Sequence, residues 1–207
     1  MKKTILFQGD SITDAFRRYE NDSHLGTGYA NMVSARLGLE NPGEYTFYNK
    51  GISGNRIVDL YARMKAEILN LKPDYLSILI GVNDVWHEKM YQNGVTPEKF
   101  KKIYGMLLTE IKEALPDIKI MLLEPFVADG AMTNDALEWF KVEVAKMAEK
   151  VHELAEEFNL PLIELQADLD AMQANAPESY WLYDGVHPSI FFHQHMADKW
   201  IATFKTL

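Results

Sequence analysis

The chain has 207 residues, with 21 Lys and Arg against 30 Asp and Glu, a net charge of −9, and no cysteine. The lack of cysteine excludes disulfides, thiolate metal sites and a cysteine nucleophile, so any catalysis must use oxygen or nitrogen side chains. The negative charge argues against a partner with a polyphosphate backbone, and we expect no nucleic-acid partner. The apolar run near the amino terminus is too short for a secretory signal, and no stretch reaches the roughly 20 apolar residues of a membrane span. We therefore expect a cytoplasmic protein with no membrane partner.

Short apolar runs rich in β-forming residues alternate along the chain with longer amphipathic segments. The runs predict strands at residues 5–7, 45–48, 75–80, 118–123 and 160–165, the last weakened by a proline near its start. Between and after them, apolar residues recur every three or four positions and predict helices at residues 29–37, 58–71, 97–115, 134–158 and 189–204. Long loops are expected at residues 128–134 and 175–188. This alternation predicts one α/β domain over residues 1–207, with a five-stranded, mostly parallel sheet covered on both faces.

Small, hydroxyl and amide residues follow three of the predicted strands, and a fourth polar loop lies far along the chain. The three strand ends carry residues 9–14, 49–55 and 81–84, and the fourth loop is residues 183–188. In an open parallel sheet, ligands bind at the carboxyl ends of the strands. These loops are therefore where a site is expected.

One loop supplies a serine and another supplies an acid and a histidine. A serine hydroxyl needs a neighbouring base, the base needs an orienting acid, and the oxyanion formed on attack needs hydrogen-bond donors. We predict that Ser11 attacks, that His187 accepts the proton and that Asp184, three residues earlier, orients the imidazole. The backbone N–H groups of Ser11 and Gly54 and the side-chain amide of Asn83 are the predicted oxyanion donors.

Each of these residues has a plainer interpretation. Gly51 competes with Gly54, since either glycine can supply positive φ in a tight loop. Asn83 could cap a helical segment after the third strand, and Asp184 could be a turn acid bonded to its own backbone. Asp10 is interpreted first as an acceptor that orders the loop beside Ser11.

The blocks in this order resemble the GDSL esterases, also called SGNH hydrolases. The resemblance rests on Gly9-Asp10-Ser11-Ile12, the loop with Gly54, Gly81-Val82-Asn83-Asp84, and the pair Asp184 and His187. Within that superfamily, residues 25–29, 49–55 and 80–86 resemble the carbohydrate acetylesterases, notably the acetyl-xylan esterases. Two departures matter: Ile12 stands where the family usually has leucine, and Gly51 competes with Gly54 for the second block, although the polar residue that follows favours Gly54.

The resemblance implies a flavodoxin-like three-layer α/β/α fold and a metal-free serine esterase without cofactors. It implies a small acetylated substrate, such as an acetylated xylo-oligosaccharide, hydrolysed through an acyl-enzyme. Related esterases often assemble, so the resemblance also implies homo-oligomers as an expectation.

Aromatic and polar side chains near these loops are candidates for substrate binding. The predicted substrate-binding residues are Asp10, Arg56, Trp86, Trp181 and Tyr183. Sugars stack on flat aromatic faces, but Trp and Tyr at these positions could equally pack the loop. Arg56 could likewise pair with Asp59.

Three other functions remain open from the sequence. The same machinery could serve a lipid-directed esterase, lysophospholipase or thioesterase. The chain could be a carbohydrate-binding module, although Ser11, Asn83, Asp184 and His187 together argue against it. A metal hydrolase could be built from His187 with His193, His195 and a carboxylate, but residues two apart do not share a helix face.

Overall fold

A parallel sheet of five strands forms the centre of the molecule in the computed structural model, which describes residues 2–207 apart from the side chain of residue 178. The strands are β1 (Lys3–Gly9), β2 (Tyr45–Asn49), β3 (Tyr75–Leu79), β4 (Lys119–Leu123) and β5 (Leu162–Ile163). Their order across the sheet is β2-β1-β3-β4-β5, and every pairing is parallel. This is the flavodoxin-like order, whose direction of winding reverses between β1 and β3.

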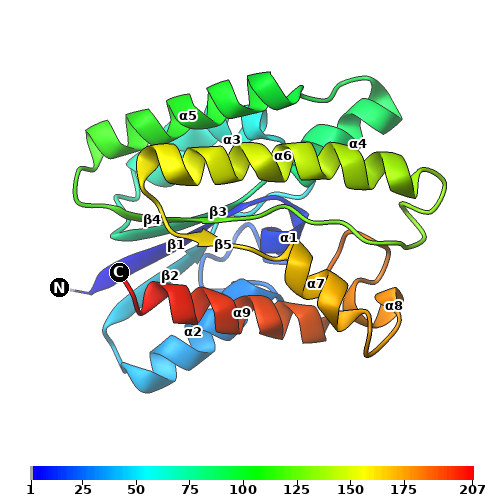
Figure 1. Cartoon of the computed structure of the whole chain (residues 1–207). Helices are drawn as coiled ribbons and strands as arrows, with labels where there is room; N and C mark the ends of the chain where they lie inside the picture. The colour runs from blue at the N-terminus through cyan, green and yellow to red at the C-terminus, as the bar shows by residue number, and fades with distance from the viewer. Residues whose placement is uncertain (1) are drawn as a thin grey trace.

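Helices cover both faces of the sheet, so the predicted three layers are confirmed (Figure 1). One face carries α3 (Ile57–Met64), α4 (Val82–Tyr91), α5 (Pro97–Ala114) and α6 (Leu137–Phe158). The other face carries α2 (Tyr29–Glu40) and α9 (Ile190–Phe204), with the short α7 (Gln166–Met172) and α8 (Glu178–Trp181) beside α9. Within residues 2–207, none of the helices combines the length and the apolar character needed to cross a bilayer.

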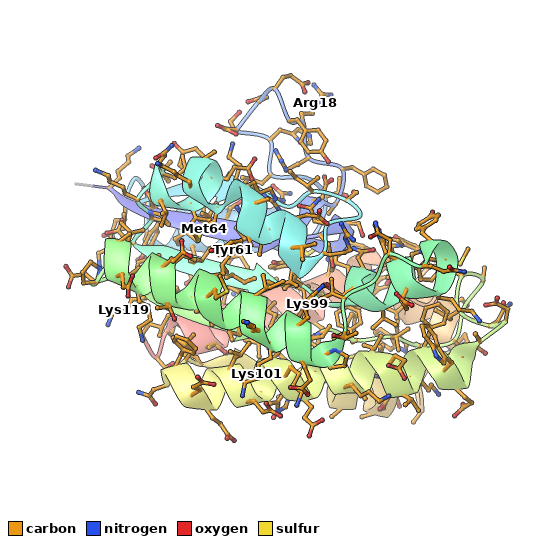
Figure 2. All side chains as sticks on the ribbon, turned by 90° about the horizontal axis from the view of Figure 1, so that it is seen from above. Arg18, Tyr61, Met64, Lys99, Lys101 and Lys119 are labelled. Carbon is orange, nitrogen blue, oxygen red and sulfur yellow. The ribbon has the colours of Figure 1, made fainter. Side chains whose placement is uncertain are left out.

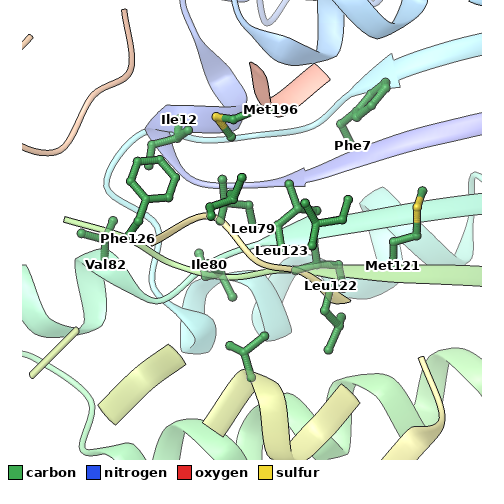
Figure 3. Packing of buried hydrophobic residues seen from close by; sticks show 14 of the residues in the cluster. Phe7, Ile12, Leu79, Ile80, Val82, Met121, Leu122, Leu123, Phe126 and Met196 are labelled. Atoms are coloured by element: carbon green, nitrogen blue, oxygen red, sulfur yellow. The ribbon is translucent and has the colours of Figure 1, made fainter. Parts of the chain in front are cut away.

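The core follows from near-continuous apolar strands packed on amphipathic helices. On the α2 and α9 face, the ring of Phe7 meets Tyr29 edge-on at 5.8 Å between centroids and lies 5.3 Å from Trp200. Ile12 and Phe126 extend this core from the strand ends into the loops (Figure 3). The loops that carry the site therefore rest on packed apolar side chains rather than on solvent.

The structure differs from the predicted elements mainly at their ends. The fifth strand is shorter than the predicted 160–165, because Pro161 has no N–H to donate and the N–H of Leu165 turns away to bond the Glu124 carboxylate at 2.7 Å. The helix predicted at 58–71 is α3, which ends at Met64, followed by a π-helical turn over Lys65–Leu69. The predicted long loop at 175–188 contains α8, and α7 and α4 were not among the predicted helices.

A segment between α1 (Ser11–Asp14) and α2 projects from one edge of the molecule, with Arg18 near its tip (Figure 2). It begins with two non-glycine residues of positive φ, Ala15 at 42° and Phe16 at 63°. The far end of this segment is anchored by a hydrogen bond from the N–H of Thr27 to the carbonyl of Ala15, at 2.7 Å. The segment therefore leaves the molecule at the end of α1 and rejoins it at the same point.

Candidate active site

Ser11 is the first residue of α1, directly after β1. Asp10 is the N-cap of that short helix, and its Oδ1 accepts a hydrogen bond from the N–H of Ile12 at 3.0 Å. Because β1 lies between β2 and β3, the loops after all three strands meet around Ser11. The switch in winding direction thus places the serine where a ligand binds in this class of sheet.

The serine, histidine and acid form a continuous chain of hydrogen bonds. Ser11 Oγ lies 2.9 Å from His187 Nε2, although the two residues are 176 positions apart. His187 Nδ1 lies 2.7 Å from Asp184 Oδ2. The other carboxylate oxygen of Asp184 accepts from the N–H groups of Val186 at 3.0 Å and His187 at 2.8 Å, which fixes the acid within its own turn. Distances of this size suit proton transfer from the hydroxyl to the imidazole.

Electrostatics within this chain of bonds favour a basic imidazole. The hydrogen bond to Asp184 raises the pKa of His187 above its usual 6.5, against the opposite effect of burial. Burial acts to raise the pKa of Asp184, but hydrogen bonds from the His187 side chain and from two backbone N–H groups outweigh it and hold that pKa below its usual value. Asp184 is therefore an ionised acid, and His187, which it holds, is a base that accepts a proton readily.

Gly51 and Gly54, which the sequence left in competition, have different surroundings. A Cβ on Gly51 would lie 2.3 Å from the backbone nitrogen of Asp14, so this glycine permits close packing of two loops. Gly54 has a φ of 80°, and a Cβ there would face open space, with His87 Nε2 at 4.0 Å. Of the two, only Gly54 borders space that a substrate could enter.

Asn83 lies in the first turn of α4, and its side chain points toward the same loop. Its Nδ2 donates to the carbonyl of Asn55 at 3.2 Å. The N-cap of α4 is Gly81, and the helix has no side-chain cap there. The capping interpretation of Asn83 is thus not what the geometry shows, and the amide reaches the backbone of Asn55, the residue after Gly54.

The model of the GDSL-like lipase/acylhydrolase family matches residues 7–194 of this chain. The chain belongs to this family. It is 33% identical over 203 residues to an acetylxylan esterase of Geobacillus stearothermophilus, a match that covers 93% of the chain and 90% of that relative. This and the family match identify it as a serine esterase.

Solved structures are similar over nearly the whole chain. A protein from Parabacteroides merdae described as a GDSL-like lipase matches with a TM-score of 0.89 and 38% identity, over 98% of this chain and 96% of that one. The acetylxylan esterase of Geobacillus stearothermophilus matches with a TM-score of 0.86 and 31% identity, over 97% of this chain and 93% of that one. Catalytic mutants of the latter enzyme have also been solved, in which a serine, an aspartate or a histidine is replaced by alanine.

Two aspartates, one at each end of α1, order the loops of this esterase. Asp14 was not predicted as a site residue, yet its Oδ2 accepts from the Ser53 N–H at 3.1 Å and from the Ser53 hydroxyl at 2.8 Å. It thereby ties the end of α1 to the loop that carries Gly54. Asp10 is only 1% exposed, and burial raises its pKa to about 7. That burial favours its loop-ordering interpretation over contact with a substrate.

The other predicted substrate-binding residues differ in how free they are. The Arg56 guanidinium binds the Asp59 carboxylate at 2.9 Å and the carbonyl of Asn93 at 2.6 Å, so the pairing interpretation describes it. Trp86 stacks on Phe140 with ring centroids 5.1 Å apart. Trp181 donates its indole N–H to the carbonyl of Met172 at 3.1 Å. Tyr183 is 66% exposed beside Asp184 and keeps a free face.

The histidines of the metal alternative have separate partners. His193 Nδ1 accepts the N–H of Tyr29 at 3.2 Å, and His195 Nε2 lies 2.8 Å from Asp168 Oδ2. His187 bonds Ser11 and Asp184. Across residues 2–207, the structure places no three His, Cys, Asp or Glu side chains where they could hold a metal ion. The geometry thus gives no support to the metal alternative.

A cavity of about 690 Å³ lies between α6 and α7. Its lining includes Glu124, His152 and Gln166 but neither Ser11 nor His187. The carboxyl oxygens of Glu124 form hydrogen bonds with His152 Nε2, at 2.9 Å, and with the backbone N–H groups of residues 165 and 166. These bonds satisfy the buried carboxyl group without a ligand.

Proposed function

We propose that this serine esterase removes acetyl groups from acetylated carbohydrates such as xylo-oligosaccharides, by nucleophilic catalysis through an acyl-enzyme. The observation that carries the mechanism is the hydrogen-bonded chain from Ser11 through His187 to Asp184, next to Gly54 and Asn83. The substrate class is supported by the similarity to an acetylxylan esterase. The catalytic mutants of that relative change the same three residue types, which supports the assignment of roles here.

In the first half of the reaction, Ser11 Oγ attacks the carbonyl carbon of the acetyl ester while His187 Nε2 takes the hydroxyl proton. Asp184 stays ionised and stabilises the imidazolium that forms. The carbonyl oxygen becomes an oxyanion, which accepts hydrogen bonds from the N–H groups of Ser11 and Gly54 and from the Asn83 amide. The Asn83 amide carries two hydrogens, so it can keep its bond to Asn55 and still donate to the oxyanion.

The tetrahedral intermediate then breaks its bond to the alcohol. His187 gives its proton to the leaving oxygen, and the sugar hydroxyl departs, which leaves an acetyl group on Ser11. In the second half, His187 takes a proton from water, the resulting nucleophile attacks the acetyl carbonyl, and acetate leaves as Ser11 recovers its proton. Each step uses only groups of this chain and water, so we expect a chelator to leave the rate unchanged.

A chain-length series of p-nitrophenyl esters tests the acyl preference. We expect hydrolysis of the acetate to exceed that of the octanoate by at least tenfold in kcat/KM. Preference for octanoate would instead support the lipid-directed alternative with the same machinery. Product analysis on acetylated xylo-oligosaccharides beside acetylated glucose and mannose then tests which sugar is deacetylated.

Replacement of Ser11 by alanine tests the nucleophile. We expect kcat to fall by roughly 10⁶-fold, because members of a triad act as a unit, with little change in thermal unfolding. Mass spectrometry of the wild type during turnover should show an acetyl adduct on the peptide that contains Ser11. If the variant kept wild-type turnover, the proposed nucleophile would be wrong.

A further inference from the structure

His87 faces the oxyanion loop from α4. It lies four residues after Asn83, which in a helix places the two side chains on one face. A Cβ built on Gly54 would come 4.0 Å from His87 Nε2 and would meet no other heavy atom within that distance. The imidazole therefore borders the open space beside Gly54, next to the predicted oxyanion donors.

The ring nitrogens of His87 have no hydrogen-bond partner among the side chains and backbone groups that the structure describes. The ring instead rests on Tyr91, one turn further along α4, edge-on with centroids 5.4 Å apart. Arg56 and Asp59 are the charged groups that act on it, and they bind each other at 2.9 Å. Burial and the neighbouring Arg56 lower the pKa of His87 below its usual 6.5. At neutral pH the ring thus offers one free donor and one free acceptor.

The chemistry of an acetyl ester decides which part of the substrate could use these atoms. An acetyl group has a methyl, which cannot hydrogen-bond, and a carbonyl oxygen, which already has its proposed donors in Ser11, Gly54 and Asn83. A polar partner for His87 must therefore belong to the alcohol portion. A sugar supplies hydroxyl groups there, each both donor and acceptor, whereas a long acyl chain would leave the imidazole nitrogens unpaired.

We propose that His87 is a specificity-determining residue that hydrogen-bonds a hydroxyl group of the sugar next to the scissile acetyl ester. This inference rests on the proposed function and adds the residue that distinguishes a polyhydroxylated alcohol from a simple one. It assigns His87 no part in the transfer of protons to or from Ser11. Its effect should therefore depend on the leaving alcohol and not on the acetyl group.

Two acetyl esters with different alcohols test the proposal. Acetylated xylobiose offers hydroxyl groups, while p-nitrophenyl acetate offers none. For His87→Ala we expect kcat/KM on the sugar ester to fall about tenfold, mostly through KM, which is the usual effect of one hydrogen bond. On p-nitrophenyl acetate the same variant should stay within about twofold of the wild type. His87→Phe, which keeps a ring, should behave like alanine, and His87→Gln, which keeps a donor and an acceptor, should recover most of the loss.

Lys89→Ala is the matched control, because Lys89 lies on the same helix but over the Trp139 ring. Equal losses on both esters would show that His87 only supports α4, and no loss on the sugar ester would show that it makes no contact. Either result overturns the proposal while leaving the esterase mechanism intact. If the wild type hydrolysed p-nitrophenyl acetate but no acetylated sugar, the proposed substrate class would fail and this inference with it.

Discussion

Asn83 combines a position in the first turn of a helix with a side chain that leaves the helix to meet a neighbouring loop. As an oxyanion donor, its amide should matter more in the transition state than in the folded ground state. We expect Asn83→Ala to lower kcat by about 10²- to 10³-fold, the usual cost of one such donor. Thermal unfolding should change little, because the amide makes a single bond at 3.2 Å in the free protein. A loss of activity matched by a large fall in Tm would instead indicate a structural role.

His187 depends on Asp184 for its basicity. The base must be neutral to accept the proton of Ser11, so kcat/KM should fall as pH drops through the pKa of His187. Because the hydrogen bond to Asp184 raises that pKa above 6.5, the acidic limb of the wild-type profile should lie above pH 6.5. Asp184→Asn should lower kcat by roughly 10⁴-fold and move the limb toward lower pH.

NMR titration of the His187 ring protons in Asp184→Asn gives a readout that does not depend on rate. The pKa of His187 should be lower in the variant than in the wild type. Asp168→Asn is the control, since Asp168 pairs with a different histidine, His195, at 2.8 Å. An unchanged pKa of His187 in Asp184→Asn would contradict the assigned partnership.

At the scale of elements, the strands were predictable because their apolar runs are short, dense and bounded by glycine or proline. The helix α4 was considered only in the capping interpretation of Asn83, since its sequence begins at the candidate residues Val82-Asn83-Asp84 and carries little amphipathic pattern. The position of the His87 side chain relative to Asn83 likewise could not be predicted before the helix was known. Once α4 is recognised, the spacing of four residues from Asn83 is enough to place His87 on the same face.

The two glycines of the loop after β2 provide a matched pair of substitutions. In Gly51→Ala the new methyl would lie 2.3 Å from the backbone nitrogen of Asp14, and backbone cannot move aside as a side chain can. We expect Gly51→Ala to lower the free energy of unfolding by about 2–4 kcal/mol. Gly54→Ala meets open space but must adopt a φ of 80°, which should cost about 1 kcal/mol.

The two substitutions should affect activity in the opposite order to stability, with the loss of kcat assigned to Gly54→Ala. Gly54→Ala strains the N–H that is proposed to hold the oxyanion, so kcat should fall by tenfold or more in a protein that is still well folded. Urea unfolding and initial rates on p-nitrophenyl acetate, measured on both variants, give the comparison. A Gly54→Ala variant with wild-type kcat would remove Gly54 from the oxyanion donors.

At the scale of the whole molecule, the site is a product of strand order rather than of local sequence. Asp184 and His187 are three residues apart, so their contact was predictable from one turn. Ser11 and His187 are 176 residues apart, and the sequence linked them by the chemistry a serine nucleophile needs and by the family resemblance, whereas their contact at 2.9 Å depends on the fold. The sequence favoured Gly54 over Gly51, but it could not supply the physical difference between them, because that depends on how closely the loop packs against α1.

Where the loops after β1, β2 and β3 meet, they bury carboxyl groups beneath the site. The titration of these groups should make the free energy of unfolding depend on pH. Burial raises the pKa of Asp10 from 3.8 to about 7, and that of Asp84 is also raised well above its usual value by burial. Between about pH 4 and pH 7 the unfolded chain has lost the Asp10 proton while the native protein retains it. The native state binds more protons in that window, so the free energy of unfolding should fall as pH rises.

Asp10→Asn should flatten this dependence, because asparagine keeps an oxygen to accept the Ile12 N–H but cannot ionise. We expect the variant to match the wild type near pH 4 and to exceed it by at least about 1 kcal/mol at pH 8, since one pKa unit corresponds to about 1.4 kcal/mol. Urea unfolding at pH 4, 6 and 8 measures the difference, with the exposed Asp129→Asn as control. A gap between Asp10→Asn and the wild type that is the same at all three pH values would show that Asp10 does not change its protonation across this range.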